Sequence, residues 1–233
     1  MVETRHYDLQ SVFAAAGGPG AFGKHATQLM ELHRRICSLE VPPIVLECGV
    51  HKGFSSGVLA DACERTGGRL VSLDIADCSA AIQSDCWTFI QTDDTDQERI
   101  LHEAPFLKQG IDLVFIDSWH AVRHVRRQLE LWYPYVRQSG WLAFHDVDPT
   151  PYMRGQPEDN RDSEIVWRDI WQLVQDFFYA NEDDLLLEYH LGDKGMAIMQ
   201  KLASMSKPPN PPRRLKARRV SFYSLARRLR GRN

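Results

Sequence analysis

Cysteine is scarce in this sequence, and long hydrophobic runs are missing. Five cysteines occur among 233 residues, and no two are spaced as Cys-x-x-Cys. An odd number of scattered cysteines argues against a disulfide framework or a zinc knuckle and favours a reducing compartment. No stretch reaches the ~18 apolar residues of a transmembrane helix, and the apolar run at residues 12–16 is too short for a signal peptide. We therefore expect a cytoplasmic protein.

Acidic residues are absent from the end of the chain. Residues 207–233 contain ten Lys or Arg and no Asp or Glu. The formal net charge of −3 therefore combines a tail of +10 with a preceding part of −13. Hydrophobic residues make up 43% of the chain, an ordinary value for a globular domain. The length predicts one large domain with appendages.

Short apolar runs alternate with segments of helical periodicity. The predicted strands are residues 44–48, 70–75, 88–92, 112–117 and 141–146. The predicted helices are residues 25–39, 55–67, 80–84, 96–103 and 121–137, with a turn at residues 17–20. Strands that alternate with helices need crossover connections, so a parallel sheet covered on both faces is expected.

The last part of the domain differs from this alternation. A helix is predicted at residues 164–179, followed by strands at residues 185–191 and 195–201, which Gly-Asp-Lys joins as a hairpin. The predicted fold is α/β, a Rossmann-like doubly wound sheet of seven strands that is mostly parallel and ends in an antiparallel hairpin. The predicted organisation is an entry segment at residues 1–23, a domain at 24–202 and a Pro-rich linker with a basic, amphipathic tail at 203–233.

In open α/β sheets the ligand lies beyond the carboxyl ends of the strands. The loop after the first strand, ECGVHKGFSS, has glycines where the backbone can turn tightly and serines that can cap a helix. Its spacing matches neither the dinucleotide nor the triphosphate glycine motif. Asp74 ends the second strand, where it can either cap a helix or accept hydrogen bonds from both ribose hydroxyls. Together these features favour a small nucleoside ligand.

Four blocks in order, IVLECGVHKGFSS, LVSLDI, DLVFIDSWHAVRHVRRQLELWYPYV and SGWLAFHD, carry a family resemblance. They resemble class I S-adenosylmethionine-dependent methyltransferases. The nearest groups are the small-molecule O-methyltransferases that act on sugars and catechols and the branch called methyltransferase 24. The resemblance covers residues 25–201.

The resemblance implies S-adenosylmethionine as the cofactor. It implies that the cofactor is bound by Glu47, Gly49, His51, Gly53, Ser55, Asp74, Asp93 and Asp117. Among these, Ser55 would meet the methionine carboxylate, Asp74 the ribose and Asp93 the adenine. The cofactor carries a sulfonium and an ammonium, so a rim of acids would attract it. The acids of that predicted rim are Glu47, Asp74, Asp93 and Asp117.

The related sugar and catechol enzymes hold a magnesium ion with acids after the fourth and fifth strands. Carried over, the candidate ligands are Asp117, His145 and Asp146, with Trp119 where the sugar enzymes have a further acid. A set that includes histidine suits manganese, iron or zinc better than magnesium, so a divalent metal (Mg or Mn) and a metal-free site both remain open. His120 is the predicted general base because the branch favours an acid followed three residues later by His. His145 is the second catalytic candidate.

Two aromatic residues, Trp119 and Tyr152, are expected to touch the acceptor, while Trp167 and Trp171 are expected to pack on the sheet. The loop at residues 147–162 is long enough to form a lid. Four other histidines are expected to lie on helix faces without a special role: His6, His25, His33 and His124.

The resulting hypothesis is an O-methyltransferase that acts on a hydroxyl of a small polar acceptor, such as a sugar of a glycan precursor or natural product. Two alternatives stay open, a metal-dependent protein similar to cephalosporin hydroxylase and a non-catalytic tethering module. The tail fits an anionic membrane surface, which would place the protein at the inner membrane, or a partner subunit in a homo-oligomer. Nucleic acid is the less favoured partner, and a solvated tail is the simplest alternative.

Overall fold

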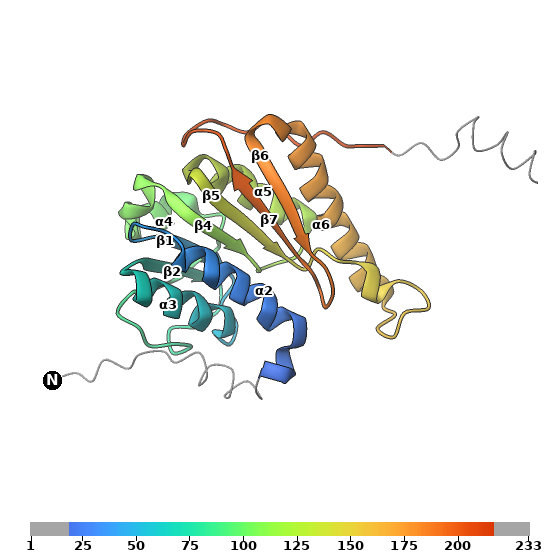
Figure 1. Ribbon diagram of the computed structural model, residues 1–233, viewed down its shortest axis with the longest axis horizontal. Helices are drawn as coiled ribbons and strands as arrows, with labels where there is room; N and C mark the ends of the chain where they lie inside the picture. The colour runs from blue at the N-terminus through green and yellow to red at the C-terminus, as the bar shows by residue number, and fades with distance from the viewer. Residues whose placement is uncertain (1–18, 217–233) are drawn as a thin grey trace, which may run out of the picture.

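The computed structural model describes residues 19–216. Seven strands form one sheet in the order β3-β2-β1-β4-β5-β7-β6, with helices on both faces (Figure 1). The strands are β1 (Ile44–Cys48), β2 (Arg69–Asp74), β3 (Trp87–Gln91), β4 (Ile111–Ile116), β5 (Val136–His145), β6 (Leu185–His190) and β7 (Met196–Lys201). The helices are α2 (Pro19–Cys37), α3 (Phe54–Thr66), α4 (Gln97–Glu103), α5 (Val122–Trp132) and α6 (Arg161–Ala180). Strands β1 to β5 pair in parallel, and β7 pairs antiparallel with β5 and β6. The predicted fold class is therefore confirmed.

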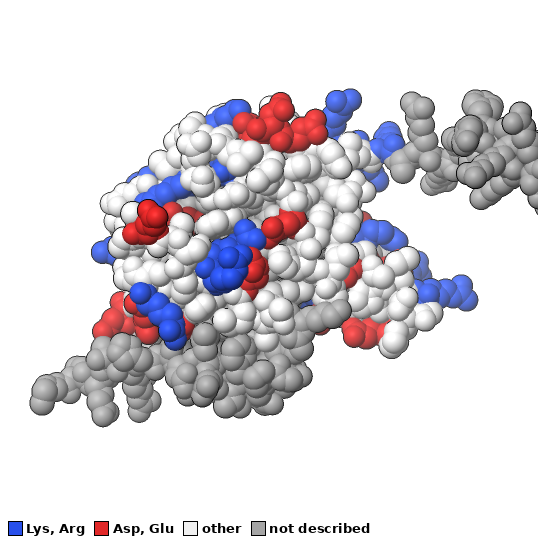
Figure 2. Space-filling model, viewed as in Figure 1, with Lys and Arg blue, Asp and Glu red and all other residues white. Residues whose placement is uncertain are grey.

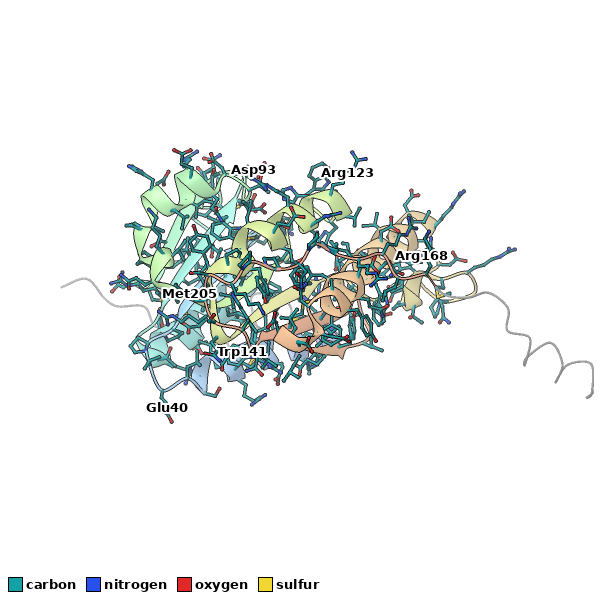
Figure 3. The ribbon with its side chains drawn as sticks, turned by 90° about the horizontal axis from the view of Figure 1, so that it is seen from above. Glu40, Asp93, Arg123, Trp141, Arg168 and Met205 are labelled. Carbon is teal, nitrogen blue, oxygen red and sulfur yellow. The ribbon has the colours of Figure 1, made fainter. Side chains whose placement is uncertain are left out.

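The sheet has a hydrophobic core on each face because successive side chains of a strand point to opposite sides. Val45 packs with α2 and α3, whereas its neighbour Leu46 packs with α4, α5 and α6. In the view of Figure 3, Asp93 and Arg123 lie on the α4 and α5 side and Trp141 on the α2 side. Each buried apolar side chain contributes about 1.5–3 kcal/mol, so the two cores hold the central strands in one register.

The strand order reverses between β1 and β4, which are neighbours in the sheet. Their carboxyl ends stay in contact, because Asp117 donates its backbone N–H to Cys48 O at 2.9 Å, while Gly49 donates its N–H to Leu73 O of β2 at 2.8 Å. Gly49 has a φ of 100°, and a Cβ there would lie 2.3 Å from Asp117 O. Only glycine allows the two loops to approach this closely.

Two local predictions are wrong. The predicted turn at residues 17–20 overlaps the described chain at Pro19, where α2 begins. Residues 80–84 form a turn and extended chain rather than a helix. Ile82 of this segment is buried at 3% exposure, and its Cγ2 would lie 3.1 Å from a Cβ on Gly53. Burial of Ile82 beneath the first loop, rather than helical periodicity, sets the conformation of this connection.

The described chain does not leave the domain at Leu202, the predicted boundary. Lys207 Nζ lies 2.7 Å from Asp184 Oδ1, and Asn210 N donates to Asn181 Oδ1 at 2.7 Å. Leu215 N donates to Asp176 Oδ1 at 2.8 Å. Residues 203–216 therefore form a strap along the carboxyl end of α6. Residues 217–233, which carry most of the predicted basic tail, and residues 1–18 of the predicted entry segment lie outside the described residues.

No helix among residues 19–216 is both long enough and apolar enough to cross a membrane.

Candidate active site

The loop after β1 is held in place by Asp74 at the end of β2. The backbone N–H groups of Val50 and His51 donate to Asp74 Oδ2 at 3.0 and 3.1 Å, and that of Ala76 donates to Oδ1 at 2.9 Å. Burial opposes the charge of Asp74, but these N–H groups outweigh it and hold its pKa below the ordinary value. His51 and Gly53 both have positive φ, 50° and 76°. The loop therefore has a defined shape around an ionised carboxylate.

Glu47 does not lie on an exposed rim, although the sequence suggested that it would. It is fully buried, and its Oε2 accepts hydrogen bonds from Ser56 Oγ at 2.6 Å and Ser72 Oγ at 2.5 Å. Burial raises the pKa of Glu47 to about 7 despite these hydroxyl donors. Ser55, the predicted partner of the methionine carboxylate, is also buried in the first turn of α3. Glu47 is thus an internal group that is only partly ionised at neutral pH.

Figure 2 shows Asp and Glu in small separate groups on the face it presents, interspersed with Lys and Arg. On that face the acids form no single large field.

A second group of side chains follows β4 and β5. His120 Nε2 lies 3.3 Å from Asp117 Oδ1 and 3.2 Å from Asp146 Oδ2. One ligand atom from each of Asp117, His120 and Asp146 lies within 4.8 Å of the others. Asp146 Oδ1 and His120 Nε2 are buried, and their contacts with the neighbouring charged groups, at 3.0 to 3.3 Å, do not have hydrogen-bond geometry. This set of two carboxylates and an imidazole can accept a divalent cation.

His145 was the predicted metal ligand at this point, but it is turned between the two carboxylates. Its Nδ1 lies 3.2 Å from Asp117 Oδ1 and 3.0 Å from Asp146 Oδ1. Burial lowers the pKa of His145, but the two carboxylates outweigh burial and raise the pKa to about 10. The same contacts lower the pKa of Asp117 against the effect of burial. The two carboxylates therefore favour the charged form of His145.

The other nitrogen of His145 faces helix α2. His145 Nε2 and His25 Nδ1 are 2.9 Å apart, and their rings meet edge to face with centroids 4.5 Å apart. Burial, followed by the neighbouring His145, lowers the pKa of His25. A neutral His25 can accept the Nε2–H of His145, which fixes the orientation of the His145 ring. His25 is thus part of the site, although the sequence indicated only a residue on a helix face without a special role.

The far end of the site lies at the end of β3. Buried Asp94 accepts hydrogen bonds from Ser118 Oγ at 2.6 Å and Gln128 Nε2 at 2.8 Å, and its Oδ1 lies 2.8 Å from His124 Nε2. Trp119 is 70% exposed, and its ring centroid lies 5.4 Å from that of His124. Asp93, the predicted adenine contact, is exposed and bonds to Thr95. The ring of His124 therefore packs against the ring of Trp119, a role that its helical spacing did not indicate.

The loop after β5 packs on α6. Tyr152 and Trp167 meet edge to face with centroids 3.8 Å apart, and Asn160 N donates to Tyr152 O at 3.1 Å. Trp167 is buried at 7% exposure, and Trp171 stacks on Tyr189 of β6. Lys194, in the turn between β6 and β7, extends over Trp167 with its Nζ 5.9 Å from the ring centroid. Sequence reasoning missed Lys194, whose only signal was its place in the tight Gly-Asp-Lys turn.

Comparison with protein families gives a match over residues 46–147 to the methyltransferase 24 family, described as a methyltransferase domain. This match includes the ends of β1, β2, β3, β4 and β5 and confirms the resemblance to class I methyltransferases. No curated protein sequence matches the chain.

Several solved methyltransferases have a similar fold. The MycE methyltransferase of the mycinamycin pathway, in complex with Mg and S-adenosylhomocysteine (SAH), is 23% identical with a TM-score of 0.56; the match covers 88% of this chain and 56% of MycE. The SAH-bound methyltransferase PaMTH1 from Podospora anserina is 16% identical with a TM-score of 0.55, covering 83% and 87% of the two chains. CalS11, a TDP-rhamnose 3′-O-methyltransferase of calicheamicin biosynthesis, is 20% identical with a TM-score of 0.50, covering 78% and 82%.

Proposed function

We propose that this chain, whose residues 46–147 match a methyltransferase domain, transfers a methyl group from S-adenosylmethionine to a hydroxyl of a small polar acceptor. The observation that carries this proposal is the adjacency of two groups at the strand ends. The Asp74-bound loop after β1 abuts the backbone of Asp117, which itself belongs to the Asp117–His120–Asp146 cluster. A cofactor held by the first group would present its methyl carbon to the second.

Asp74 is the residue proposed to bind the ribose. It keeps an ionised carboxylate at the end of β2, and its exposure is intermediate, so its oxygens can accept further hydrogen bonds. Gly49, His51 and Gly53 shape the loop so that its backbone can approach the methionine part. Asp93 is the proposed neighbour of the adenine, and Trp119, which is 70% exposed, is proposed to contact the acceptor. Buried Glu47 acts from behind the loop through the hydroxyls of Ser56 and Ser72.

Methyl transfer is an in-line displacement. The acceptor oxygen attacks the methyl carbon, the sulfur–methyl bond breaks with its electron pair left on sulfur, and the acceptor hydroxyl loses its proton. His120 Nε2 is the proposed site that takes this proton, because Asp117 and Asp146 lie 3.3 and 3.2 Å away and stabilise the imidazolium that forms. His145 holds both carboxylates in place and is the proposed positioning residue. Holding the two reacting atoms in line supplies much of the rate enhancement.

The same cluster fits a divalent cation. One ligand atom from each of Asp117, His120 and Asp146 lies within 4.8 Å of the others, and Nε2 of His120 is buried. Asp117, His120 and Asp146 would hold the ion, which when bound lowers the pKa of an acceptor hydroxyl. His120 Nε2 serves either as ligand or as base, so the two modes of activation exclude each other. The donor set suits manganese better than magnesium.

Calorimetry with S-adenosylmethionine and SAH tests the cofactor site. Asp74→Asn removes a charged acceptor, and we expect it to weaken binding about 10- to 100-fold. The matched control is Asp77→Asn, an acid three residues further on that bonds only to Ser79 among the described contacts of its carboxylate. Equal affinity in wild type and Asp74→Asn, or no binding at all, would contradict the proposal.

The acceptor is proposed to be a sugar of a glycan precursor or natural product. This is supported by CalS11, which is named as a TDP-rhamnose 3′-O-methyltransferase, and by the exposed ring of Trp119 in the loop after β4. Release of SAH is measured with a panel of free and nucleotide-linked sugars. We expect His120→Gln to lower the rate about 10²- to 10⁴-fold, and His102→Gln, an exposed histidine on α4, to leave it unchanged. Cofactor binding without SAH release from any sugar would favour the tethering or hydroxylase alternatives.

The basic tail is proposed to bring the domain to an anionic membrane surface. The support is the sequence of residues 217–233, which has six Arg and no acidic residue, together with the strap that fixes where the chain leaves α6. Flotation with vesicles that contain anionic lipid is expected to recover the full chain but not a chain truncated after Lys216. If both float equally, docking of the tail on a partner subunit is tested next by their oligomeric states.

A further inference from the structure

Lys194 reaches the candidate active site from the hairpin turn between β6 and β7. Its Nζ lies 3.8 Å from Asp146 Oδ1, too far for a hydrogen bond but close enough for a strong electrostatic interaction. The side chain is 45% exposed and lies along Trp167. The ammonium is therefore held near the carboxylate without being committed to it.

The turn that carries Lys194 is held by a buried carboxylate. Asp148 is 4% exposed, and its Oδ2 accepts the Gly192 N–H at 2.9 Å while its own N–H donates to Lys194 O at 2.7 Å. Gly195 packs so closely that a Cβ there would lie 2.5 Å from Asp148 Cβ. The loop after β5, which begins with Asp146, thus fixes the backbone of Lys194.

Helix α2 supports the same turn from the other side. Gln28 is 3% exposed and donates its Nε2–H groups to His190 O and Gly192 O, each at 3.1 Å. Two buried polar side chains from different elements therefore hold one partly exposed turn. The ammonium of Lys194 varies only through its side-chain torsions, because its backbone has little freedom.

Asp146 Oδ1 is the atom that connects this turn to the proposed metal site. It is buried, its 3.0 Å contact with His145 Nδ1 does not have hydrogen-bond geometry, and it lies 3.8 Å from the ammonium of Lys194. A divalent cation held by Asp117, His120 and Asp146 would lie close to that ammonium. Two positive charges beside the same carboxylate repel each other strongly in a partly desolvated site.

We propose that Lys194 and a divalent cation are alternative occupants of the space beside Asp146. Without the cation, the ammonium of Lys194 partly neutralises the carboxylate. With the cation bound, the ammonium swings away along Trp167 toward solvent, where it faces the acceptor side of the site. Lys194 thus sets the affinity of the site for the metal. It thereby decides whether the acceptor hydroxyl is activated by the metal or by His120 as base. This inference rests on the proposed function of the cluster.

Titration of the full-length protein with Mn²⁺, followed by calorimetry, tests the inference. Lys194→Met keeps the length and apolar contacts of the side chain but removes its charge, and we expect it to bind Mn²⁺ about tenfold more tightly than wild type. Lys194→Arg keeps the charge and is expected to bind like wild type. The control Arg168→Met removes an exposed charge of α6 that pairs with Glu164, and is expected to have no effect. The gain should shrink as salt is raised, because salt screens the repulsion.

The inference is overturned if Lys194→Met binds Mn²⁺ as wild type does or more weakly, or if neither protein binds Mn²⁺. A gain in Lys194→Arg equal to that in Lys194→Met would also overturn it, since the effect would then not be one of charge. Binding of SAH is measured on the same samples. If SAH binds but Lys194→Met does not change the affinity for Mn²⁺, this inference alone is wrong. If wild type does not bind SAH, the proposed function is wrong.

Discussion

Gly49→Ala tests whether the close approach of the loops after β1 and β4 needs glycine. In the structure Gly49 has a φ of 100°, and an added Cβ would lie 2.3 Å from Asp117 O and 2.8 Å from Asp117 C. Both atoms belong to the backbone, so no side-chain rotation relieves the overlap. The loops must move apart, at the point where β1 and β4 end.

The cost has two parts. A non-glycine residue at positive φ costs about 1–2 kcal/mol. Overpacking against a fixed backbone adds about 1–3 kcal/mol. We therefore expect Gly49→Ala to lower the free energy of unfolding by about 2–5 kcal/mol. It should also weaken SAH binding, because the loop that Asp74 holds would be displaced.

Gly67 provides a matched control. It also has positive φ, at 68°, but a Cβ there would meet nothing within 4 Å. Gly67→Ala should therefore show the conformational cost alone, about 1 kcal/mol, with SAH binding unchanged. Urea denaturation at constant m-value measures both free energies, and calorimetry measures SAH affinity. If Gly49→Ala is no more destabilising than Gly67→Ala, the close contact with Asp117 is not present in solution.

Three further predictions concern other parts of the domain. The pKa of Glu47 is raised from 4.5 to about 7, so the native state binds more protons than the unfolded state between these pH values. The free energy of unfolding should therefore fall as pH rises from 4.5 to 7. In urea titrations Glu47→Gln should flatten this slope. Asp61 is buried, and its Oδ2 lies 2.6 Å from His33 Nε2. Asp61→Asn should lower the free energy of unfolding by about 3 kcal/mol. An unchanged midpoint of urea denaturation would show that the pair contributes nothing to stability. The side chain of Asn181 bonds to Phe177 O and to the backbone C=O and N–H of Asn210. Asn181→Ala should therefore lower the free energy of unfolding by about 1–3 kcal/mol and selectively remove hydrogen-exchange protection at Asn210 and Leu215. Retained protection there would refute a strap held by this residue.

The central strands could be predicted from the sequence because each is an apolar run that is buried in the sheet, whereas the edge strands β3 and β6 are only partly buried. β1, with its sequence IVLEC, has the bounds that the sequence predicts, and the others differ at their ends. The segment around Ile82 was predicted wrongly as a helix, since five residues carry too little periodicity to outweigh packing beneath the first loop. The start of α2 at Pro19 was missed because the nearby glycines were interpreted as a turn.

Part of the candidate site could be located for the same topological reason. Carboxyl ends of parallel strands meet at one edge of a sheet, so Asp74, Asp117 and Asp146 had to lie near one another once the strands were assigned. The orientation of His145 could not be predicted. Its neighbours Asp117 and His25 are 28 and 120 residues away in the chain, and their positions depend on how β4 and α2 pack.

The sequence by itself determined the alternation of strands and helices, the parallel sheet, the loop at Gly49 and the acids at the strand ends. These features follow from local periodicity and from steric limits on single residues. Only the tertiary structure decided that Glu47 is buried, that single ligand atoms of Asp117, His120 and Asp146 lie within 4.8 Å of one another, and that Lys194 stands beside Asp146. Charges and pKa values at such a site depend on distances and burial, and residues distant in the chain acquire these only when the helices and the hairpin pack on the sheet.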